Sequence, residues 1–248
     1  MRVPGRRDAL RVLAAGGFAA VFGCKASDRA PPSLPAAGNA RAPDIRDLSC
    51  IVKPAQTEGP YFVDEKLERA DIRTDPTDGS VKAGIPLELT ISVYQIAGGS
   101  CAPLAGALVD IWQCDATGTY SDVADTDARF NTSGKKFLRG YLRTNAEGLA
   151  CFTTIYPGWY PGRTPHLHFK VRAGAERDRT HEFTSQLYFD DALTARAYTQ
   201  APYSVRGKRD TTNSADEIYR EGGEQLLLSL TPQGAGYRTT FGLGLRFS

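Results

Sequence analysis

The chain has 248 residues, of which 41% are hydrophobic and 23% are charged, values typical of a globular protein with a buried core. Its formal net charge of +2 comes from the first 23 residues, because the remaining 26 basic and 27 acidic residues give a net charge of −1. A body so close to neutral lacks the electrostatic basis for binding nucleic acid, so we expect no nucleic-acid partner.

Residues 1–24 have the order of charge and hydrophobicity that is typical of an export signal. Arg6 and Arg7 precede an apolar run over residues 12–23 that is too short to span a bilayer, and the adjacent arginines resemble a twin-arginine signal. The run ends in VFGC, which resembles a lipobox and leaves two outcomes open: lipidation at Cys24, which would anchor the protein to a membrane, or simple cleavage. Both outcomes predict an exported protein, periplasmic or anchored to the envelope.

Residues 25–49 are rich in proline and alanine and show no apolar period, which is typical of a flexible tether. The composition does not shift again after Cys50. We therefore expect one domain over residues 50–248.

The body of the chain reads as short strands separated by turns rich in glycine and proline, with a hairpin turn over residues 145–148. This pattern predicts an all-β fold, a sandwich or a barrel. Short helices fit only residues 191–200 and 214–221, and residues 226–230 fit either a strand or a helix. The expected strands cover residues 87–96, 107–114, 136–144, 149–156, 165–171, 183–189 and 237–247.

Four cysteines follow Cys24 in the chain: Cys50, Cys101, Cys114 and Cys151. An even number of cysteines in an exported protein suggests disulfides, for which three pairings exist. We favour Cys50–Cys101 with Cys114–Cys151, while the alternative keeps Cys114 and Cys151 reduced as small apolar residues. The sequence lacks a Cys-x-x-Cys motif, which argues against a structural zinc site.

Two of the three histidines, His166 and His168, lie one residue apart in the expected strand 165–171. Side chains two residues apart in a strand point to the same face, so both imidazoles can bind one metal ion; paired histidines without a metal are the alternative. A cupin would need a glutamate four or five residues later, where Arg172 and Ala173 stand. A zinc hydrolase would need a third histidine or a well-spaced carboxylate.

Tyrosine is the candidate for the remaining ligands of such a metal. Tyr120, Tyr156 and Tyr160 fall at expected strand ends or in loops. A phenol has a pKa of about 10, so only a strong Lewis acid such as Fe(III) holds it deprotonated at neutral pH. Core packing is the commoner role of a buried tyrosine, and residue type alone does not choose among the eleven tyrosines.

Six segments together resemble the intradiol ring-cleavage dioxygenases, the family that contains protocatechuate 3,4-dioxygenase and catechol 1,2-dioxygenase. The resemblance spans about residues 50–248, and the order Tyr…Tyr…Arg-x-x-His-x-His is its most specific part. The segments are QTEGPYF (56–62), GIPLELTISV (84–93), GALVDIWQCDATGTYSD (106–122), FLRGYLRTNAEG (137–148), FTTIYPGWYPGRTPHLHFKV (152–171) and TSQLYF (184–189).

The resemblance implies a β-sandwich that holds one mononuclear non-haem Fe(III) by two tyrosines and two histidines. Mapped onto this sequence, the metal ligands are Tyr120, Tyr160, His166 and His168. Tyr156 falls where the family has no ligand.

Further residues carry over from the same resemblance. Arg163 matches an arginine beside the bound substrate, and Gln186 matches a glutamine that supports the site. The segment with Gly59 and Pro60 resembles one that approaches the substrate pocket, although a Gly-Pro pair is equally typical of a plain turn.

By resemblance the protein is an enzyme that uses O2 to cleave a catechol-type ring between its two hydroxyl-bearing carbons, which gives a muconate-type diacid. Tyr160 is then the axial ligand that leaves and accepts a proton, and Arg163 stabilises negative charge on the ring. The alternative is a metal-free, transthyretin-like binding module of the envelope. The sequence leaves open which catechol is the substrate and whether the chain forms a homodimer.

Overall fold

The computed structural model describes residues 51–125, 129–176 and 179–246, all within one compact unit. The expected export signal, Cys24, the tether and Cys50 lie outside the described residues, so export, the lipid anchor and the domain boundary near residue 50 stay predictions. No helix within the described ranges is long and apolar enough to cross a membrane.

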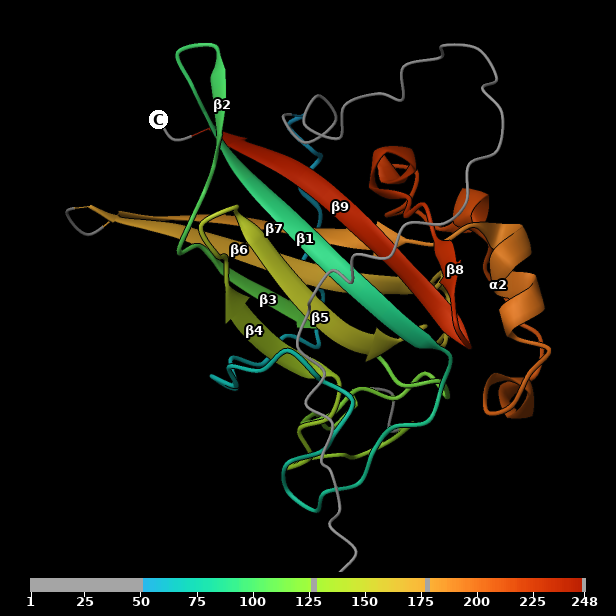
Figure 1. Cartoon of the computed structure of the whole chain (residues 1–248). Helices are drawn as coiled ribbons and strands as arrows, with labels where there is room; N and C mark the ends of the chain where they lie inside the picture. The colour runs from blue at the N-terminus through green and yellow to red at the C-terminus, as the bar shows by residue number, and fades with distance from the viewer. Residues whose placement is uncertain (1–50, 126–128, 177–178, 247–248) are drawn as a thin grey trace, which may run out of the picture. The chain divides into compact units, whose positions relative to one another are not determined.

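One sheet is built around the parallel pair of β1 and β9, which are far apart in the sequence. β5 pairs with the first part of β1, β2 pairs with its end, and β8 lies on the other side of β9 (Figure 1). The strands are β1 (Pro86–Ala97), β2 (Ser100–Pro103), β5 (Leu149–Ile155), β8 (Thr231–Gln233) and β9 (Gly236–Arg246).

The second sheet is fully antiparallel and has the order β4-β3-β6-β7. Its strands are β3 (Leu108–Trp112), β4 (Arg139–Arg143), β6 (His166–Glu176) and β7 (Arg179–Tyr188). The expected strands of both sheets are confirmed, and the short strands β2 and β8 were not predicted.

The two sheets pack face to face around one hydrophobic core, so the all-β sandwich is confirmed (Figure 1). Leu89 and Ile91 of β1 and Leu167 and Phe169 of β6 are buried in this core. Burying one such side chain contributes about 1.5–3 kcal/mol relative to leaving it exposed.

The outer face of the four-stranded sheet carries the remaining residues of β6. Because side chains alternate along a strand, His166, His168 and Lys170 point away from the core that buries Leu167 and Phe169. Loop residues 56–62 and the described loop residues 113–125 and 129–138 cover this outer face at the end where β6 begins. The histidine pair therefore lies between a rigid sheet and its covering loops.

The helical segments lie in the loops, as expected, and differ in detail from the prediction. α2 (Asp191–Ala197) confirms the helix expected at 191–200, and Asp190 caps its first turn by accepting from the Leu193 backbone N–H. The helix expected over 214–221 is wrong, because the chain forms a 3-10 helix, η2 (Asn213–Ala215), followed by turns. The remaining 3-10 helices are η1 (Tyr203–Arg206) and η3 (Gly223–Leu226).

Residues 226–230 form neither of the two elements that their sequence allowed. The segment ends η3 and makes a single bridge from Leu227 to Tyr188 of β7. One backbone hydrogen bond, from Leu228 N–H to the Tyr188 carbonyl, fixes it there.

The expected Cys114–Cys151 disulfide is wrong, since both cysteines are free. Cys114 is buried on the outer side of the four-stranded sheet, whereas Cys151 is exposed on β5 between the core residues Ala150 and Phe152. The two thiols thus face opposite sides of the sandwich and cannot reach each other. The Cys50–Cys101 pairing stays a prediction, because Cys50 lies outside the described residues.

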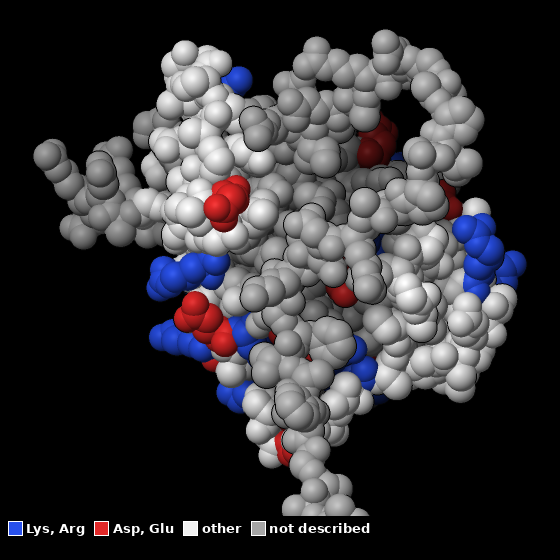
Figure 2. All heavy atoms as spheres, in the orientation of Figure 1, with Lys and Arg blue, Asp and Glu red and all other residues white. Residues whose placement is uncertain are grey.

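Charges of both signs are mixed on the surface. Figure 2 shows lysine and arginine side chains close to aspartate and glutamate side chains on one side of the face in view. Ion pairs among the described residues include Arg172–Asp110 at 2.7 Å and Lys136–Glu65 at 2.6 Å.

Candidate metal centre

The histidine pair of β6 shares one face, as its spacing predicts. The two Nε2 atoms of His166 and His168 lie 3.1 Å apart, and the ring centroids are 4.7 Å apart at an interplanar angle of 80°. Both rings are buried, at 2% and 1% exposure. Two imidazole nitrogens therefore converge on one point beneath the surface.

The orientation of each imidazole is fixed by a neighbour. His166 Nδ1 lies 2.7 Å from the Thr164 carbonyl oxygen, which only accepts hydrogen bonds, so Nδ1 carries the proton and Nε2 keeps its lone pair. The His168 ring stacks on Trp112, with centroids 4.9 Å apart and planes 8° apart. Trp112 is positioned for this contact because it lies opposite His168 in the β3–β6 register.

Tyr160 lies in the loop that joins β5 to β6 and brings its hydroxyl to the same point. Its Oη is 3.1 Å from His166 Nε2. At 8% exposure, against 0% for Tyr120, it is the tyrosine of the cluster nearer to solvent.

Tyr120, in the loop after β3, completes the cluster. Its ring centroid lies 5.8 Å from that of Tyr160 and 6.3 Å from that of His168. The ring is held by Tyr61, which stacks on it at 4.5 Å. Within the described residues the buried Tyr120 hydroxyl has no hydrogen-bond partner, which is costly unless a ligand satisfies it.

Burial sets the protonation of all four groups. It lowers the pKa of His166 and of His168 well below the usual value, with Arg163 adding to the effect, so both imidazoles are neutral. Burial raises the pKa of Tyr160 to about 12, against the opposing charge of Arg163, and raises the pKa of Tyr120 well above its usual value. A cation that binds the two phenol oxygens must therefore displace two protons.

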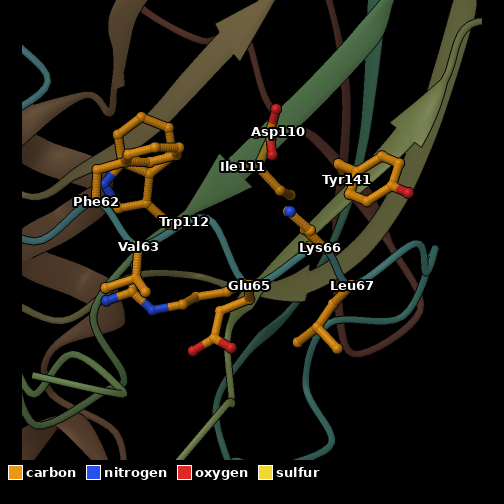
Figure 3. Close-up of a pocket in the computed structure, with 11 residues that line it drawn as sticks. Phe62, Val63, Glu65, Lys66, Leu67, Asp110, Ile111, Trp112 and Tyr141 are labelled. Atoms are coloured by element: carbon orange, nitrogen blue, oxygen red, sulfur yellow. The ribbon is translucent and has the colours of Figure 1, made fainter.

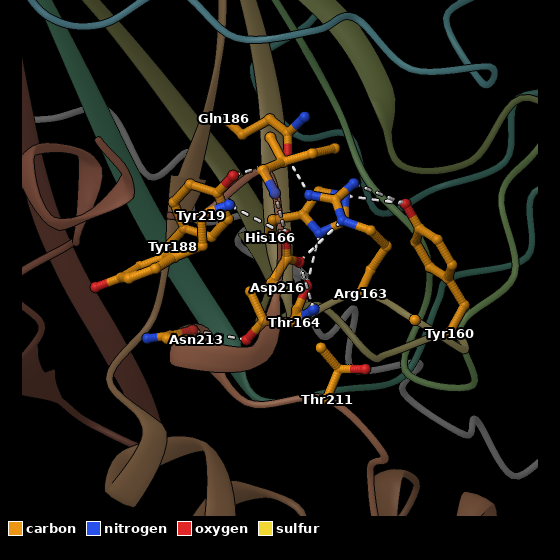
Figure 4. A network of polar contacts seen from close by, with 12 residues as sticks. Tyr160, Arg163, Thr164, His166, Gln186, Tyr188, Thr211, Asn213, Asp216 and Tyr219 are labelled. Carbon is orange, nitrogen blue, oxygen red and sulfur yellow. Dashed lines mark hydrogen bonds and ion pairs between the residues drawn. The ribbon is translucent and has the colours of Figure 1, made fainter. Parts of the chain in front are cut away.

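Arg163 places a positive charge beside the cluster (Figure 4). Its Nη1 lies 3.5 Å from Tyr160 Oη and 3.4 Å from His166 Nε2. Its Nη2 donates to Gln186 Oε1 at 2.5 Å, and Gln186 Nε2 in turn donates to the Thr57 carbonyl at 2.9 Å. Both residues thus lie at the edge of the histidine and tyrosine cluster.

The Gly59 segment also reaches the cluster. A Cβ added at Gly59 would lie 3.4 Å from Cε1 and 3.9 Å from Nε2 of His168, and the residue has a positive φ of 70°. Glycine is therefore suited both to the backbone conformation and to the close approach. Pro60 is exposed.

Tyr156 packs in the sandwich core and its hydroxyl lies 2.6 Å from Thr194 Oγ1, so it belongs to a different part of the molecule.

A small cavity lies behind Trp112, lined among others by Phe62, Glu65 and Arg139 (Figure 3). Its volume is about 10 Å³, far below the roughly 300 Å³ at the lower end of small-molecule pockets. It is therefore too small to be a substrate site.

The donor set fits a trivalent cation. No three His, Cys, Asp or Glu side chains within the described ranges converge on one point, so a metal site here depends on the two phenols. Two neutral imidazoles and two phenol oxygens, of which the buried Tyr120 hydroxyl is unsatisfied, are the groups that a hard Lewis acid would engage.

Three residues that support the cluster were not predicted from the sequence. Trp112 and Tyr61 both lie in segments that carry the family resemblance, yet their contacts depend on strand register and loop folding. Asp216, whose carboxylate lies 2.9 Å from Arg163 Nε, is 53 residues away in the chain and had no sequence signal.

Comparison with known proteins gives a consistent assignment. The sequence model of the family described as Dioxygenase matches residues 57–221. Catechol 1,2-dioxygenase of Candida albicans is 27% identical over 169 residues, covering 60% of this chain and 50% of the relative. The β chain of protocatechuate 3,4-dioxygenase of Burkholderia cepacia is 34% identical over 125 residues, covering 46% and 51%. The chain thus spans about half the length of these curated relatives.

The fold is also similar to that of a solved structure. An intradiol ring-cleavage dioxygenase from Tetranychus urticae superposes with a TM-score of 0.67 at 28% identity, covering 79% of this chain and 95% of that chain. The chain belongs to the family of intradiol ring-cleavage dioxygenases.

Proposed function

We propose that the chain is an Fe(III)-dependent dioxygenase that cleaves catechol-type rings between the two hydroxyl-bearing carbons. The observation that carries the proposal is the convergence of Tyr120, Tyr160, His166 and His168 in one buried cluster with Arg163 at its edge. The family relatives that are named catechol 1,2-dioxygenase and protocatechuate 3,4-dioxygenase support the substrate class.

The reaction balances without an external reductant. The carbon–carbon bond between the two hydroxyl-bearing carbons breaks, both atoms of O2 enter the product, and the ring supplies the electrons. The product is a muconate-type diacid. When bound by the four ligands, Fe(III) would supply Lewis acidity that draws electron density from the diol.

Tyr160 is suited to handle a proton of the substrate. It is the outer tyrosine of the cluster, and a phenol whose pKa burial raises to about 12 is a strong base once deprotonated. Its Oη can then accept a proton from one substrate hydroxyl, while Tyr120, fully buried beneath Tyr61, stays in place.

Arg163 is suited to stabilise negative charge on the substrate. Gln186 fixes its Nη2, and its Nη1 faces the point where Tyr160 and His166 meet. A preorganised donor of this kind contributes roughly 3–4 kcal/mol to a transition state that develops negative charge. Gly59, which has no Cβ, leaves room next to His168.

Aerobic purification tests the proposal directly. We expect a coloured protein with about one iron per chain, because phenolate bound to Fe(III) absorbs visible light, and oxygen uptake with members of a catechol panel. The product should be a diacid. Cleavage beside the two hydroxyl-bearing carbons gives a product of the same mass that is not a diacid, so the functional groups of the product must be identified. A colourless, iron-free protein that consumes no oxygen with any catechol would sink the proposal and favour a metal-free binding module.

A further inference from the structure

Asp216 is a buried carboxylate that contacts the candidate site from a distant part of the chain. Its Oδ2 accepts from Arg163 Nε at 2.9 Å and from Thr164 N–H at 2.8 Å. Its Oδ1 accepts from the backbone N–H groups of Ile218 and Tyr219 at 2.9 and 3.0 Å. With four N–H donors and 0% exposure, this side chain is held in a single position.

The first consequence concerns the direction of the Arg163 guanidinium (Figure 4). Asp216 holds its Nε and Gln186 holds its Nη2, so two edges of the planar group are occupied. The third nitrogen, Nη1, is thereby aimed at Tyr160 Oη and His166 Nε2. Without Asp216 the guanidinium would keep one anchor and could rotate about it.

The second consequence concerns His166. The same Oδ2 atom fixes the Thr164 backbone, and Thr164 Oγ1 lies 2.6 Å from Asn213 Oδ1. The Thr164 carbonyl is the group that accepts from His166 Nδ1. The segment 213–216 therefore holds the backbone that selects the His166 tautomer.

The contacts also close into a circuit. Gln186 Oε1 accepts from Tyr188 Oη at 3.1 Å, and that hydroxyl lies 2.8 Å from Gln56 Oε1. Gln56 Nε2 donates to the Ile218 carbonyl at 2.8 Å, which returns to the turn that begins at Asp216. The two glutamine oxygens share the single proton of the Tyr188 hydroxyl, and such a linked buried network favours one arrangement.

We propose that Asp216 is a positioning residue of the candidate site. It aims Arg163 at the point where Tyr160 Oη and His166 Nε2 meet, and through Thr164 it keeps His166 Nε2 turned to that point. The catalytic part of this inference rests on the proposed dioxygenase function.

Asp216→Asn tests the inference with minimal change in shape. The variant replaces the charged acceptor of Arg163 Nε by a neutral amide, so we expect kcat with catechol to fall about ten- to a hundredfold. KM should change much less, because the arginine acts on charge that develops during the reaction. The iron content should stay near that of the wild type.

Asp75→Asn is the matched control. Asp75 is also buried and caps a turn, accepting from Thr77 N–H at 2.9 Å and Thr77 Oγ1 at 2.7 Å, but it lies outside the cluster. We expect it to lower the midpoint of unfolding without changing kcat or KM. A fall in kcat equal to that of Asp216→Asn would reduce the role of Asp216 to fold stability and overturn the proposal.

A double variant separates positioning from any independent effect. In the Arg163→Met background, adding Asp216→Asn should lower kcat much less than it does in the wild type, because the group that Asp216 aims is gone and only its hold on Thr164 is left to lose. In metal-free protein the second change should recover part of the stability lost with Arg163→Met, since it removes a buried charge without a partner. Additive losses of the two substitutions, both in kcat and in the free energy of unfolding of the metal-free protein, would overturn the proposal.

The unfolding measurements also separate the two proposals. If the wild type neither binds iron nor consumes oxygen, the proposed function fails. The unfolding free energies of the single and double variants, measured in metal-free protein, still decide whether Asp216 and Arg163 are coupled, because they need no activity.

Discussion

The Tyr160 side chain offers the sharpest test at the scale of a single residue. Tyr160→Phe removes the hydroxyl but keeps the ring that packs edge-on against Tyr61 and Tyr120 at 5.8 Å. We therefore expect a folded protein that retains part of its iron, absorbs at a shifted wavelength and turns over catechol at least about 100-fold more slowly. Iron content, visible spectrum and oxygen uptake measure these effects.

Tyr203→Phe is the control for loss of a buried tyrosine hydroxyl. Tyr203 donates to the Tyr156 carbonyl at 2.7 Å and packs in the sandwich core, away from the cluster. It should cost stability and leave the spectrum unchanged. Unchanged turnover in Tyr160→Phe would show that the ligand assignment is wrong.

Single residues also show which parts of the site the sequence could predict. The shared face of His166 and His168 follows from the two-residue period of a strand. The resemblance added Tyr120, Tyr160, Arg163 and Gln186, and the structure brings all of them together. The stacking of Trp112 on His168 depends on strand register, and the contact of Asp216 depends on a turn 53 residues away. Local patterns do not encode either contact.

At the scale of elements, the crossing of two loop segments connects the candidate ligands. Gly158 N–H donates to the Asp115 carbonyl at 3.1 Å, which joins the segment before Tyr160 to the segment before Tyr120. A Cβ at Gly158 would lie 2.4 Å from the Asp115 oxygen and 2.6 Å from the Ala116 oxygen. Backbone oxygens cannot rotate away, so the segments would have to separate.

Gly158→Ala should therefore affect both stability and the metal. We expect the free energy of unfolding of the metal-free protein to fall by about 1–3 kcal/mol, and the iron content to fall with it. Gly162→Ala is the control, since its φ of 80° is strained but no atom lies within 4 Å of the added carbon. Denaturant titration and iron analysis compare the two variants. Equal iron loss in Gly158→Ala and Gly162→Ala would contradict the idea that the crossing of the two loop segments holds the metal ligands in place.

The elements themselves were predicted well where alternation is strong and poorly where it is absent. The long strands of both sheets follow from alternating apolar residues, whereas β2, with all four residues exposed, has no such pattern. The segment 214–221 has the composition of a helix, but the Asp216 side chain caps a turn there instead. A side chain that competes for backbone N–H groups overrides helix propensity at this point.

At the scale of the whole molecule, the free thiols of Cys114 and Cys151, both in the described part of the chain, lie on opposite sides of the core and should react very differently. Cys151 is exposed, while Cys114 is buried and burial raises the pKa of its thiol. We expect a thiol reagent to label Cys151 in the native protein and Cys114 only after unfolding, as measured by peptide mapping. Native labelling of Cys114, or a peptide that links the two cysteines, would contradict the described arrangement.

The double role of β6 has a consequence for the choice of metal. Leu167 and Phe169 alternate with the two histidines along this strand and are packed in the close-packed core. The backbone of the strand therefore resists the stretching or bending that would change the spacing of His166 and His168. The packing of aliphatic and aromatic side chains on the other face of the strand thus helps to set the distance between the two imidazole nitrogens. An ion of another radius would have to be fitted by rotation of the two imidazoles alone, and repacking of the core would shift the strand beneath both ligands and so change which ion is preferred.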